Sequence, residues 1–472
     1  MYNNYIKPKE VKMLNKTLIE RILGIAVSSG ADFAEIFWET TRNGNVVLLN
    51  GKIDAITDST VTGAGIRAFV GTRTVYASTS DMSEKGLVAC ARSVAEAVAE
   101  GGSELTVTVS GGRVADIHKI KTMPLSSDVR LRCDILREAC DSARAFDERI
   151  AQVTGNLVAV ERSIGVANTE GLLKEDSHVR TRISVGAVAS ANGENQSGGA
   201  SPGRSMGLEL FELFPPKEIG VNAARQAITN LVADYCPAGQ MTVAIENGFG
   251  GVIFHEACGH SLEATSVGTG RSQMCGKLGQ KIANEKITAI DDGTIPNAWG
   301  SVNIDDEGNP TRRNVLIENG VLKSYMVDRL GSRRMGLPMT GNSRRESYLY
   351  EPTSRMTNTF IDNGPDKNED IIASIEYGLY AKSMGGGSVN PLTGAFNFAV
   401  NEGYIVRNGK ICEPVRGASL IGTGSEILND IDMVGQNLDV GQGMCGSSSG
   451  SVPTDVGQPL IRVSKITVGG RN

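Results

Sequence analysis

The run 33-FAEIFWETTRNGNVVLLNGKIDAITDSTVTGAGIRAFVGTRTVYAST-79 decides the predicted fold class. Apolar and polar residues alternate through most of it, which is typical of strands that bury one face. Asn43-Gly44 and Asn50-Gly51 lie between alternating segments, and Asn-Gly is a strong signal for a two-residue hairpin turn. The run therefore predicts consecutive antiparallel hairpins.

Helices are predicted around these hairpins. Residues 15–29 and 82–99 carry apolar residues at helical spacing, and Ser83 is a suitable N-cap for the second segment. A third helix is predicted near 127–145, and further alternating strands over 150–198. The N-terminal half is thus predicted to be a layer of antiparallel strands covered by helices.

Two adjacent prolines in 212-ELFPPKEIG-220 interrupt the pattern and predict a domain boundary. We expect an N-terminal α+β domain over residues 1–214 and a C-terminal domain over 215–472. Hairpins are predicted in the second domain across Asn319-Gly320 and Asn408-Gly409. Its helices are predicted over 218–234, 248–266 and 368–383. The fold class is therefore α+β, with two domains, largely antiparallel sheets packed with helices, and a C-terminal domain rich in strands.

Composition argues against several functional classes. The formal net charge is −6, and no run of five or six lysines and arginines occurs, which disfavours direct binding of nucleic acid. No stretch approaches 18 apolar residues, so we expect no membrane span. The eight cysteines form no CxxC pair and are expected to be reduced, as in the cytoplasm.

The segment 251-GVIFHEACGHSLEA-264 holds two of the four histidines of the chain, His255 and His260, with Glu256 directly after the first. On a regular helix, residues five apart point about 140° away from each other, whereas residues four apart differ by about 40°. A shared metal site thus requires a break in the helix. A π-bulge would supply it, and so would a helix that ends or kinks near Gly259. The alternative is a buried helix with two hydrogen-bonded histidines.

Two imidazoles could bind Zn²⁺, and a catalytic site needs a third protein ligand and an open position. Glu256 then stands where a general base would deprotonate metal-bound water. Glu263 could be a ligand or could support one. Cys445 lies in the Gly- and Ser-rich segment 436–459, predicted to be a flexible loop, where it is either a thiolate ligand or an ordinary loop thiol.

Other segments are open to two readings. Gly385, Gly386 and Gly387 could present bare backbone to a peptide, or they could stop the preceding helix. Arg344 and Arg345 could bind a substrate carboxylate or the reaction's oxyanion, or they could be solvated surface residues. The two remaining histidines, His118 and His178, are interpreted as surface or strand residues.

The C-terminal half closely resembles the TldD branch of the TldD/PmbA metalloprotease family. The stretches that carry this resemblance include 250-GGVIFHEACGHSLEA-264, 304-IDDEGNP-310, 339-MTGNSRRESY-348, 355-RMTNT-359, 385-GGGSV-389, 420-LIGTGSE-426 and 443-GMCG-446. The resemblance implies an HExxxH zinc protease with one Zn²⁺ per chain. It assigns His255, His260 and Cys445 as ligands and Glu256 as general base, and it gives Glu263 a supporting role.

The resemblance also implies a function. Members of the family hydrolyse short or unfolded peptides by metal-activated water, and a sister branch, TldE or PmbA, lacks the metal motif and pairs with the TldD branch. We therefore expect a cytoplasmic metallopeptidase that forms a heterodimer with a TldE/PmbA-like subunit or a homodimer. The alternatives are a peptide-binding or assembly subunit with structural zinc, and a modulator of DNA gyrase, which is an older label of the family.

Overall fold

The computed structural model describes residues 14–99, 101, 105–390 and 394–471. Its strands form three large sheets and one two-stranded sheet, and most neighbouring strands run antiparallel. Helices pack against these sheets, and the C-terminal half is rich in strands. The predicted α+β fold class is confirmed.

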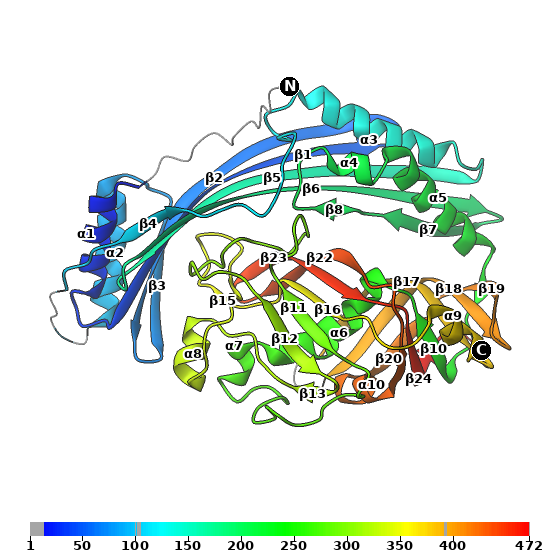
Figure 1. The fold of residues 1–472 in the computed structure, drawn as a ribbon. Coiled ribbons are helices and arrows are strands. Elements are labelled where there is room, and N and C mark those ends of the chain that lie inside the picture. Colours follow the sequence, from blue (N-terminus) through cyan, green and yellow to red (C-terminus); the bar gives the residue numbers. More distant parts are fainter. Residues whose placement is uncertain (1–13, 100, 102–104, 391–393, 472) are drawn as a thin grey trace, which may run out of the picture.

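The first sheet is long and curved, and it arches over the C-terminal half of the chain (Figure 1). In spatial order its strands are β3 (Arg73–Thr79), β2 (Lys52–Val70), β1 (Phe33–Leu49), β5 (Ile150–Asn168), β6 (Leu172–Ala191) and β4 (Ser110–Arg113), and both β7 (Glu194–Ala200) and β8 (Gly203–Arg204) also pair with β6. The hairpin turn at Asn50-Gly51 is confirmed, with φ of 47° and 82°.

The turn predicted at Asn43-Gly44 is wrong, because β1 runs straight through it. A Cβ atom on Gly44 would lie 2.3 Å from Leu125 and 2.4 Å from Arg132. This glycine therefore allows close packing and does not form a turn.

Helices cover the first sheet at both ends (Figure 1). These are α1 (Lys16–Val27) and α2 (Glu84–Val98) at one end, and α3 (Val129–Arg144) and α5 (Pro216–Val232) at the other. As predicted, Ser83 caps α2, and its hydroxyl accepts a hydrogen bond from the backbone N–H of Gly86. The division of the chain after residue 214 stays a prediction, and α5, which begins beyond it, packs on the first sheet.

Two further sheets form the C-terminal half. The second contains β17 (Tyr377–Val389), β10 (Gly239–Ile245), β24 (Ile461–Gly469), β20 (Ser419–Thr423), β18 (Ala395–Arg407), β19 (Lys410–Arg416) and β9 (Asp234–Tyr235), with β21 (Ile431–Val434) beside β24. Because β17 also pairs with β18, five of these strands close into a ring. The third contains β13 (Val321–Leu322), β12 (Arg313–Glu318), β11 (Ala289–Asp292), β16 (Asn358–Ile361), β23 (Gly450–Gln458) and β22 (Asp439–Ser447). A small pair is formed by β14 (Ser343–Arg344) and β15 (Thr353–Ser354).

The remaining helices are short. They are α4 (Leu210–Leu213), α6 (Val252–Ala257), α7 (Ala264–Val267), α8 (Arg329–Met335), α9 (Asn368–Ala373), α10 (Gly424–Asp430) and the 3₁₀ turns η1 (Gly248–Gly251) and η2 (Gly259–Leu262). The helix predicted over 368–383 is right only for α9. Its second part is β17, which pairs with β10 and β18, so tertiary pairing overrides the local pattern.

Successive residues of β1 face different partners. Ile36 and Trp38 pack with α1 and α2, whereas Phe37 packs with Tyr348 of the C-terminal half. Because side chains alternate along a strand, Glu35 shares the face of Phe37. Its carboxylate is therefore buried between the sheet and the C-terminal half, with 1% of the residue exposed.

Buried arginines neutralise Glu35. Arg67 Nη2 and Arg345 Nη2 each lie 3.0 Å from Glu35 Oε1, and Arg67 also pairs with Glu307. Burial acts to raise the pKa of Glu35, but the two guanidinium groups outweigh it and hold that pKa below its ordinary value. This ion network thus ties the first sheet to the C-terminal half.

We expect Glu35→Gln to lower the free energy of unfolding by about 3–5 kcal/mol, because it leaves buried guanidinium charge without its carboxylate. Glu84→Gln is the matched control, since Glu84 forms an ion pair with Arg21 in which both side chains are more than half exposed. The control should cost less than about 1 kcal/mol. Denaturant unfolding of the two variants measures the difference, and equal losses would contradict a role for burial.

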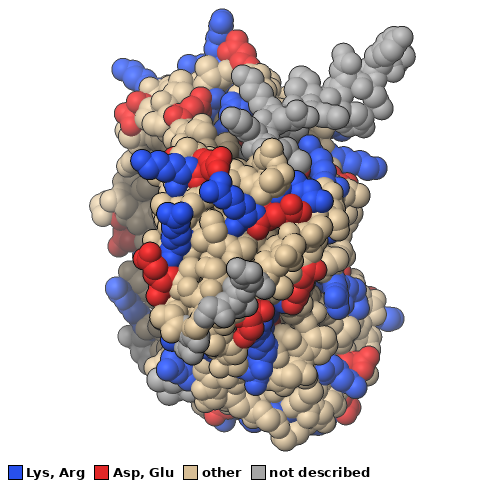
Figure 2. Space-filling model, turned by 90° about the vertical axis from the view of Figure 1, so that its left-hand side faces the viewer, with Lys and Arg blue, Asp and Glu red and all other residues tan. Residues whose placement is uncertain are grey.

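Within the part of the chain that the structure describes, no helix is long and apolar enough to cross a membrane. Figure 2 shows one face of the molecule, on which lysines and arginines are interspersed with acidic residues. That face carries no extended basic patch of the kind that nucleic-acid binding requires.

Candidate metal centre

The helix predicted over 248–266 is interrupted. α6 ends at Ala257, Cys258 leaves helical geometry with φ −130° and ψ −43°, and η2 follows. The prediction of one continuous helix is therefore wrong, whereas the predicted break is present, as a helix end next to Gly259 and not as a π-bulge. A Cβ on Gly259 would lie 2.4 Å from Met356 Sδ, so the glycine lets the buried Met356 side chain pack closely against this break.

The break brings the two histidines together. The ring centroids of His255 and His260 are 5.0 Å apart, and their planes are inclined by 82°. Cys445 Sγ lies 3.2 Å from His255 Nε2 and 3.3 Å from His260 Nε2. The three potential ligand atoms all lie within 4.8 Å of one another.

Cys445 lies on a strand. The flexible loop predicted for 436–459 is wrong, because β22 and β23 form a hairpin in which Cys445 pairs with Val452. The glycines of this region let η1 approach the hairpin. A Cβ on Gly251 would lie 2.3 Å from the carbonyl oxygen of Gly457, and one on Gly441 would lie 2.8 Å from Phe249. Glycine packing thus brings the thiol against the histidine segment.

The charges at the site favour a thiolate. Burial acts to raise the pKa of Cys445, but the neighbouring His255 and His260 lower it to about 4. Burial acts to lower the pKa of His260, but Glu263 and Cys445 raise it well above its ordinary value. A thiolate between two imidazoles is a donor set suited to zinc.

The separations also fit a zinc ion. Ligand bonds of about 2.0–2.3 Å at tetrahedral angles place an imidazole nitrogen and a sulfur roughly 3.5 Å apart. Glu263 Oε2 lies 3.2 Å from His260 Nδ1, the position from which a carboxylate orients a metal-binding histidine. His255 Nδ1 is buried and has no hydrogen-bond partner among the described residues.

Arg355 contacts both the hairpin that carries Cys445 and Glu263, which lies beside His260. The sequence analysis did not predict this role. Arg355 is fully buried and donates to the backbone carbonyl of Cys445, to Ser449 Oγ at 3.1 Å and to the carbonyl of Gly450 at 3.0 Å. Its Nε lies 3.8 Å from Glu263 Oε1. One guanidinium group therefore holds both the cysteine hairpin and the carboxylate that contacts His260.

A cavity of about 280 Å³ opens beside His260, which is one of its lining residues. It is lined by Glu256, Ala257, His260, Ser261, Glu263, Ser266, Arg271, Ser272, Val389, Gly394, Gly446 and Ser447. Glu256 Oε2 lies 3.8 Å from His260 Nε2, and 29% of the Glu256 side chain is exposed. This carboxylate can therefore reach both the histidine site and a molecule in the cavity.

The glycines and the arginines that were predicted to contact substrate lie in two separate parts of the structure. Gly385, Gly386 and Gly387 belong to β17, so the helix-stop reading is wrong, and Gly386 and Gly387 are exposed. Arg344 and Arg345 are 4% and 1% exposed, so the reading as solvated surface residues is also wrong. They line a separate cavity, and their contact with substrate stays a prediction.

Comparisons with known proteins identify the family to which the chain belongs. The chain matches the PmbA/TldA metallopeptidase domain 1 over residues 34–99, the central domain over 121–231 and the C-terminal domain over 238–470. It is 36% identical to a metalloprotease TldD homolog of Haemophilus influenzae, covering 100% of this chain and 99% of the relative. A TldD homolog of Saccharolobus solfataricus, named a zinc metalloprotease, is 32% identical over 55% of this chain and 58% of its own length.

Solved structures share the fold. A protein of Thermotoga maritima named as a modulator of a DNA gyrase superposes with a TM-score of 0.79 at 23% identity, covering 96% of this chain and 99% of that one. TldE from Thermococcus kodakarensis gives a TM-score of 0.75 at 20% identity, covering 96% and 100%. Taken with the matches to three successive family domains and the full-length relative, this places the chain in the PmbA/TldA metallopeptidase family.

Proposed function

We propose that the chain is a zinc peptidase in which His255, His260 and Cys445 hold one Zn²⁺ and Glu256 is the general base. The observation that carries the proposal is the convergence of two imidazoles and one thiolate beside an accessible carboxylate. Cys445 follows His260 by 185 residues, so chain proximity does not explain their contact. Three protein ligands and an adjacent cavity are typical of a catalytic zinc site.

The metal and the residues around it would have separate roles in the reaction. Zn²⁺ bound there would supply a Lewis acid that polarises the scissile carbonyl and lowers the pKa of water. Glu256 takes a proton from the attacking water and returns it to the leaving amine. Glu263 keeps His260 in one orientation through Nδ1, and Arg355 fixes Glu263 and the backbone of Cys445.

Short or unfolded peptides suit the surroundings of the cavity. β22 is the edge strand of the third sheet, and its residues Gly446 and Ser447 line the cavity. β17 pairs with β10 only from Gly378 to Ala381, so beyond Ala381 one edge of β17 carries no other strand among the described residues. Val389 at its end lines the same cavity. An extended peptide could pair with such edges, with the exposed Gly386 and Gly387 nearby.

We further propose assembly with a TldE/PmbA-like subunit or with a second copy. Leu49 at the end of β1 and Ile56 and Val61 on β2 are 38–48% exposed, and a protein partner could cover them. The alternative of structural zinc with Glu263 as fourth ligand is less well supported, because Glu263 contacts His260 Nδ1 and Arg355.

Removal of the metal tests the proposal. Dialysis against a strong zinc chelator should abolish hydrolysis of unstructured peptides, and one equivalent of Zn²⁺ should restore it, with and without a TldE-like subunit. Circular dichroism checks that the fold survives. Unchanged peptide hydrolysis in metal-free protein would contradict the proposal, and binding to DNA gyrase that survives chelation would favour the modulator alternative.

A further inference from the structure

Arg271 lines the cavity beside the candidate metal centre and has no role in the chemistry described above. Apart from His260, it is the one basic residue among the described residues that line this cavity. Arg271 is exposed, and its guanidinium group forms no ion pair or hydrogen bond with the part of the chain that the structure describes. A free guanidinium group therefore lies where the substrate of the proposed reaction would bind.

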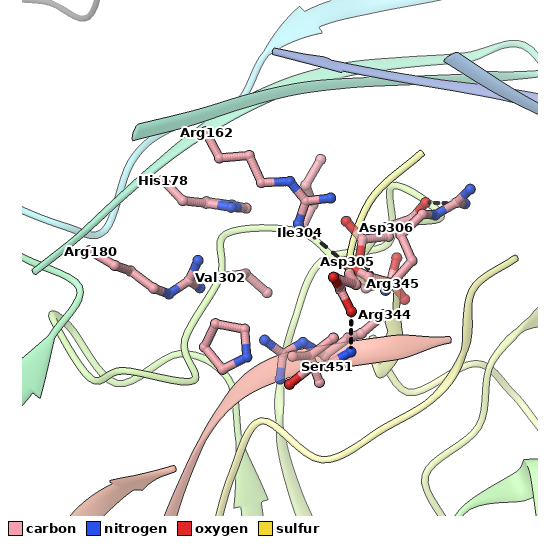
Figure 3. Close-up of a pocket in the computed structure, with 13 residues that line it drawn as sticks. Arg162, His178, Arg180, Val302, Ile304, Asp305, Asp306, Arg344, Arg345 and Ser451 are labelled. Carbon is pink, nitrogen blue, oxygen red and sulfur yellow. Dashed lines mark hydrogen bonds between the residues drawn. The ribbon is translucent and has the colours of Figure 1, made fainter. Parts of the chain in front are cut away.

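The two arginines that the sequence singled out are less well placed to meet a peptide. Arg344 and Arg345 line a separate cavity of about 30 Å³ beneath the first sheet, which holds roughly two water molecules (Figure 3). Arg345 is already paired with Glu35 at 3.0 Å. His178 points into the same cavity and is 4% exposed, so the sequence interpretation of His178 as a surface residue is wrong, although it does lie on a strand. In contrast to these residues, Arg271 lies at the larger cavity and is unpaired among the described residues.

A hydrogen-bonded turn fixes the backbone of Arg271. Its N–H donates to the carbonyl of Ser266 at 3.0 Å, and the same carbonyl accepts a hydrogen bond from Thr269 Oγ1 at 3.1 Å. Gly270 has a φ of 71°, a left-handed conformation that glycine adopts at little cost. The turn directly follows α7. Local backbone contacts therefore set the position of Arg271.

The segment that contains this turn is tied to the histidine segment at both ends. Glu263 directly precedes α7, and its carboxylate lies 3.2 Å from His260 Nδ1. Ser272, the residue after Arg271, donates from Oγ to the carbonyl of Ser261 at 2.5 Å. Ser261 is in turn the residue after His260. These contacts hold Arg271 in a defined place relative to the proposed metal ligands.

Two carboxylates also line the cavity, but neither pairs with Arg271. Glu263 contacts His260 Nδ1, and Glu256 Oε2 lies 3.8 Å from His260 Nε2. A negatively charged group of a substrate would be repelled by these two carboxylates, which disfavours its binding. Arg271 can offset this repulsion, because a guanidinium group donates two parallel hydrogen bonds to a carboxylate.

We propose that Arg271 determines substrate specificity by pairing with a carboxylate of the bound peptide. The cavity then selects peptides that carry a negative charge near the scissile bond, either at the C-terminus or on an aspartate or glutamate side chain. A bound peptide displaces water from the cavity, which makes this pair stronger than an ion pair on an open surface. The inference rests on the proposed peptidase function, because that function places the substrate in this cavity.

Matched peptides test the proposal on the full chain. One pair differs only in a free C-terminal carboxylate or a C-terminal amide, and the other only in a glutamate or a glutamine within the peptide. For one of the pairs, the wild type should have a kcat/KM at least about fivefold higher for the charged peptide. The pair that responds identifies the source of the carboxylate. Equal kcat/KM values within both pairs would overturn the proposal.

Arg271→Gln should reduce the ratio of the two kcat/KM values to about one, mainly through KM, because it removes a contact made in binding. Arg271→Lys should restore part of the ratio, since lysine keeps the charge but not the paired hydrogen bonds. Circular dichroism checks that both variants are folded. A wild-type ratio in folded Arg271→Gln would show that another group selects the substrate.

Arg334→Gln is the matched control. Arg334 lies on α8, is exposed and does not line the cavity, yet it is close to the same turn, since a Cβ on Gly268 would lie 3.5 Å from Arg334 Cβ. It should keep the wild-type ratio. An equal loss in Arg334→Gln would mean that the general surface charge sets the preference, and it would overturn the assignment to Arg271.

Binding without hydrolysis separates this proposal from the peptidase proposal. In Glu256→Gln protein, calorimetry should give a Kd at least about fivefold lower for the charged peptide, and adding Arg271→Gln should remove the difference. If the wild type cleaves no peptide but this difference is present, the peptidase function fails and the role of Arg271 in binding stands. If peptides are cleaved but the two Kd values are equal, the role of Arg271 fails and the peptidase function stands.

Discussion

Glu256→Gln should retain one zinc ion per chain and lose roughly 100- to 10,000-fold in kcat/KM for peptide hydrolysis. Glutamine has nearly the same shape as glutamate but cannot accept the proton from water. Glu256 is outside the group formed by His255, His260 and Cys445, so the change should spare the metal. Zinc analysis and peptide kinetics on one preparation distinguish a loss of catalysis from a loss of bound zinc.

Glu285→Gln is the control, because the side chain of Glu285 is 79% exposed and pairs with Lys281 at 3.8 Å. It should leave zinc content and kcat/KM unchanged. If Glu256→Gln hydrolyses peptides at the wild-type rate, Glu256 is not the base. If it loses zinc, Glu256 belongs to the ligand set and the division of roles is wrong.

Local signals predicted turns and caps well. Asn50-Gly51, Asn319-Gly320 and Asn408-Gly409 all adopt positive φ at both residues, as a two-residue hairpin turn requires. Asn43-Gly44 has the same letters but lies within a strand, because Leu125 and Arg132 pack against Gly44. The reason lies more than 80 residues away along the chain, so the local pattern could not reveal it.

In the candidate site, too, some features could be predicted from local sequence and others depend on tertiary packing. The spacing of His255 and His260 correctly required a break in the helix, because a regular helix would turn the two rings apart. Arg355 could not be found by this reasoning. Its contacts with Glu263 and with the backbone of Cys445 depend on how three distant segments pack. The glycine-rich pattern around Cys445 left a thiolate ligand and an ordinary loop thiol both open, and only the resemblance to a family made Cys445 the expected ligand.

Cys445→Ala should lower zinc affinity more than 100-fold, beyond the 10- to 100-fold that loss of a supporting contact usually costs, and should reduce peptide hydrolysis to background. The hairpin itself should survive. Arg355 donates to the backbone carbonyl of Cys445, and the pairing with Val452 also uses only backbone atoms. The variant therefore removes the thiolate and leaves the strand that carried it in place.

Cys412→Ala provides the control, since Cys412 lies on β19, is partly exposed and donates to the carbonyl of Lys410, away from the metal centre. It should bind zinc and hydrolyse peptides as the wild type does. Competition with a chromogenic chelator measures zinc affinity, and circular dichroism reports whether both variants stay folded. Folded Cys445→Ala with wild-type zinc affinity would remove the thiolate from the metal centre. The two histidines would then need a different third ligand, and Glu256, whose Oε2 lies 3.8 Å from His260 Nε2, would be the first carboxylate to test.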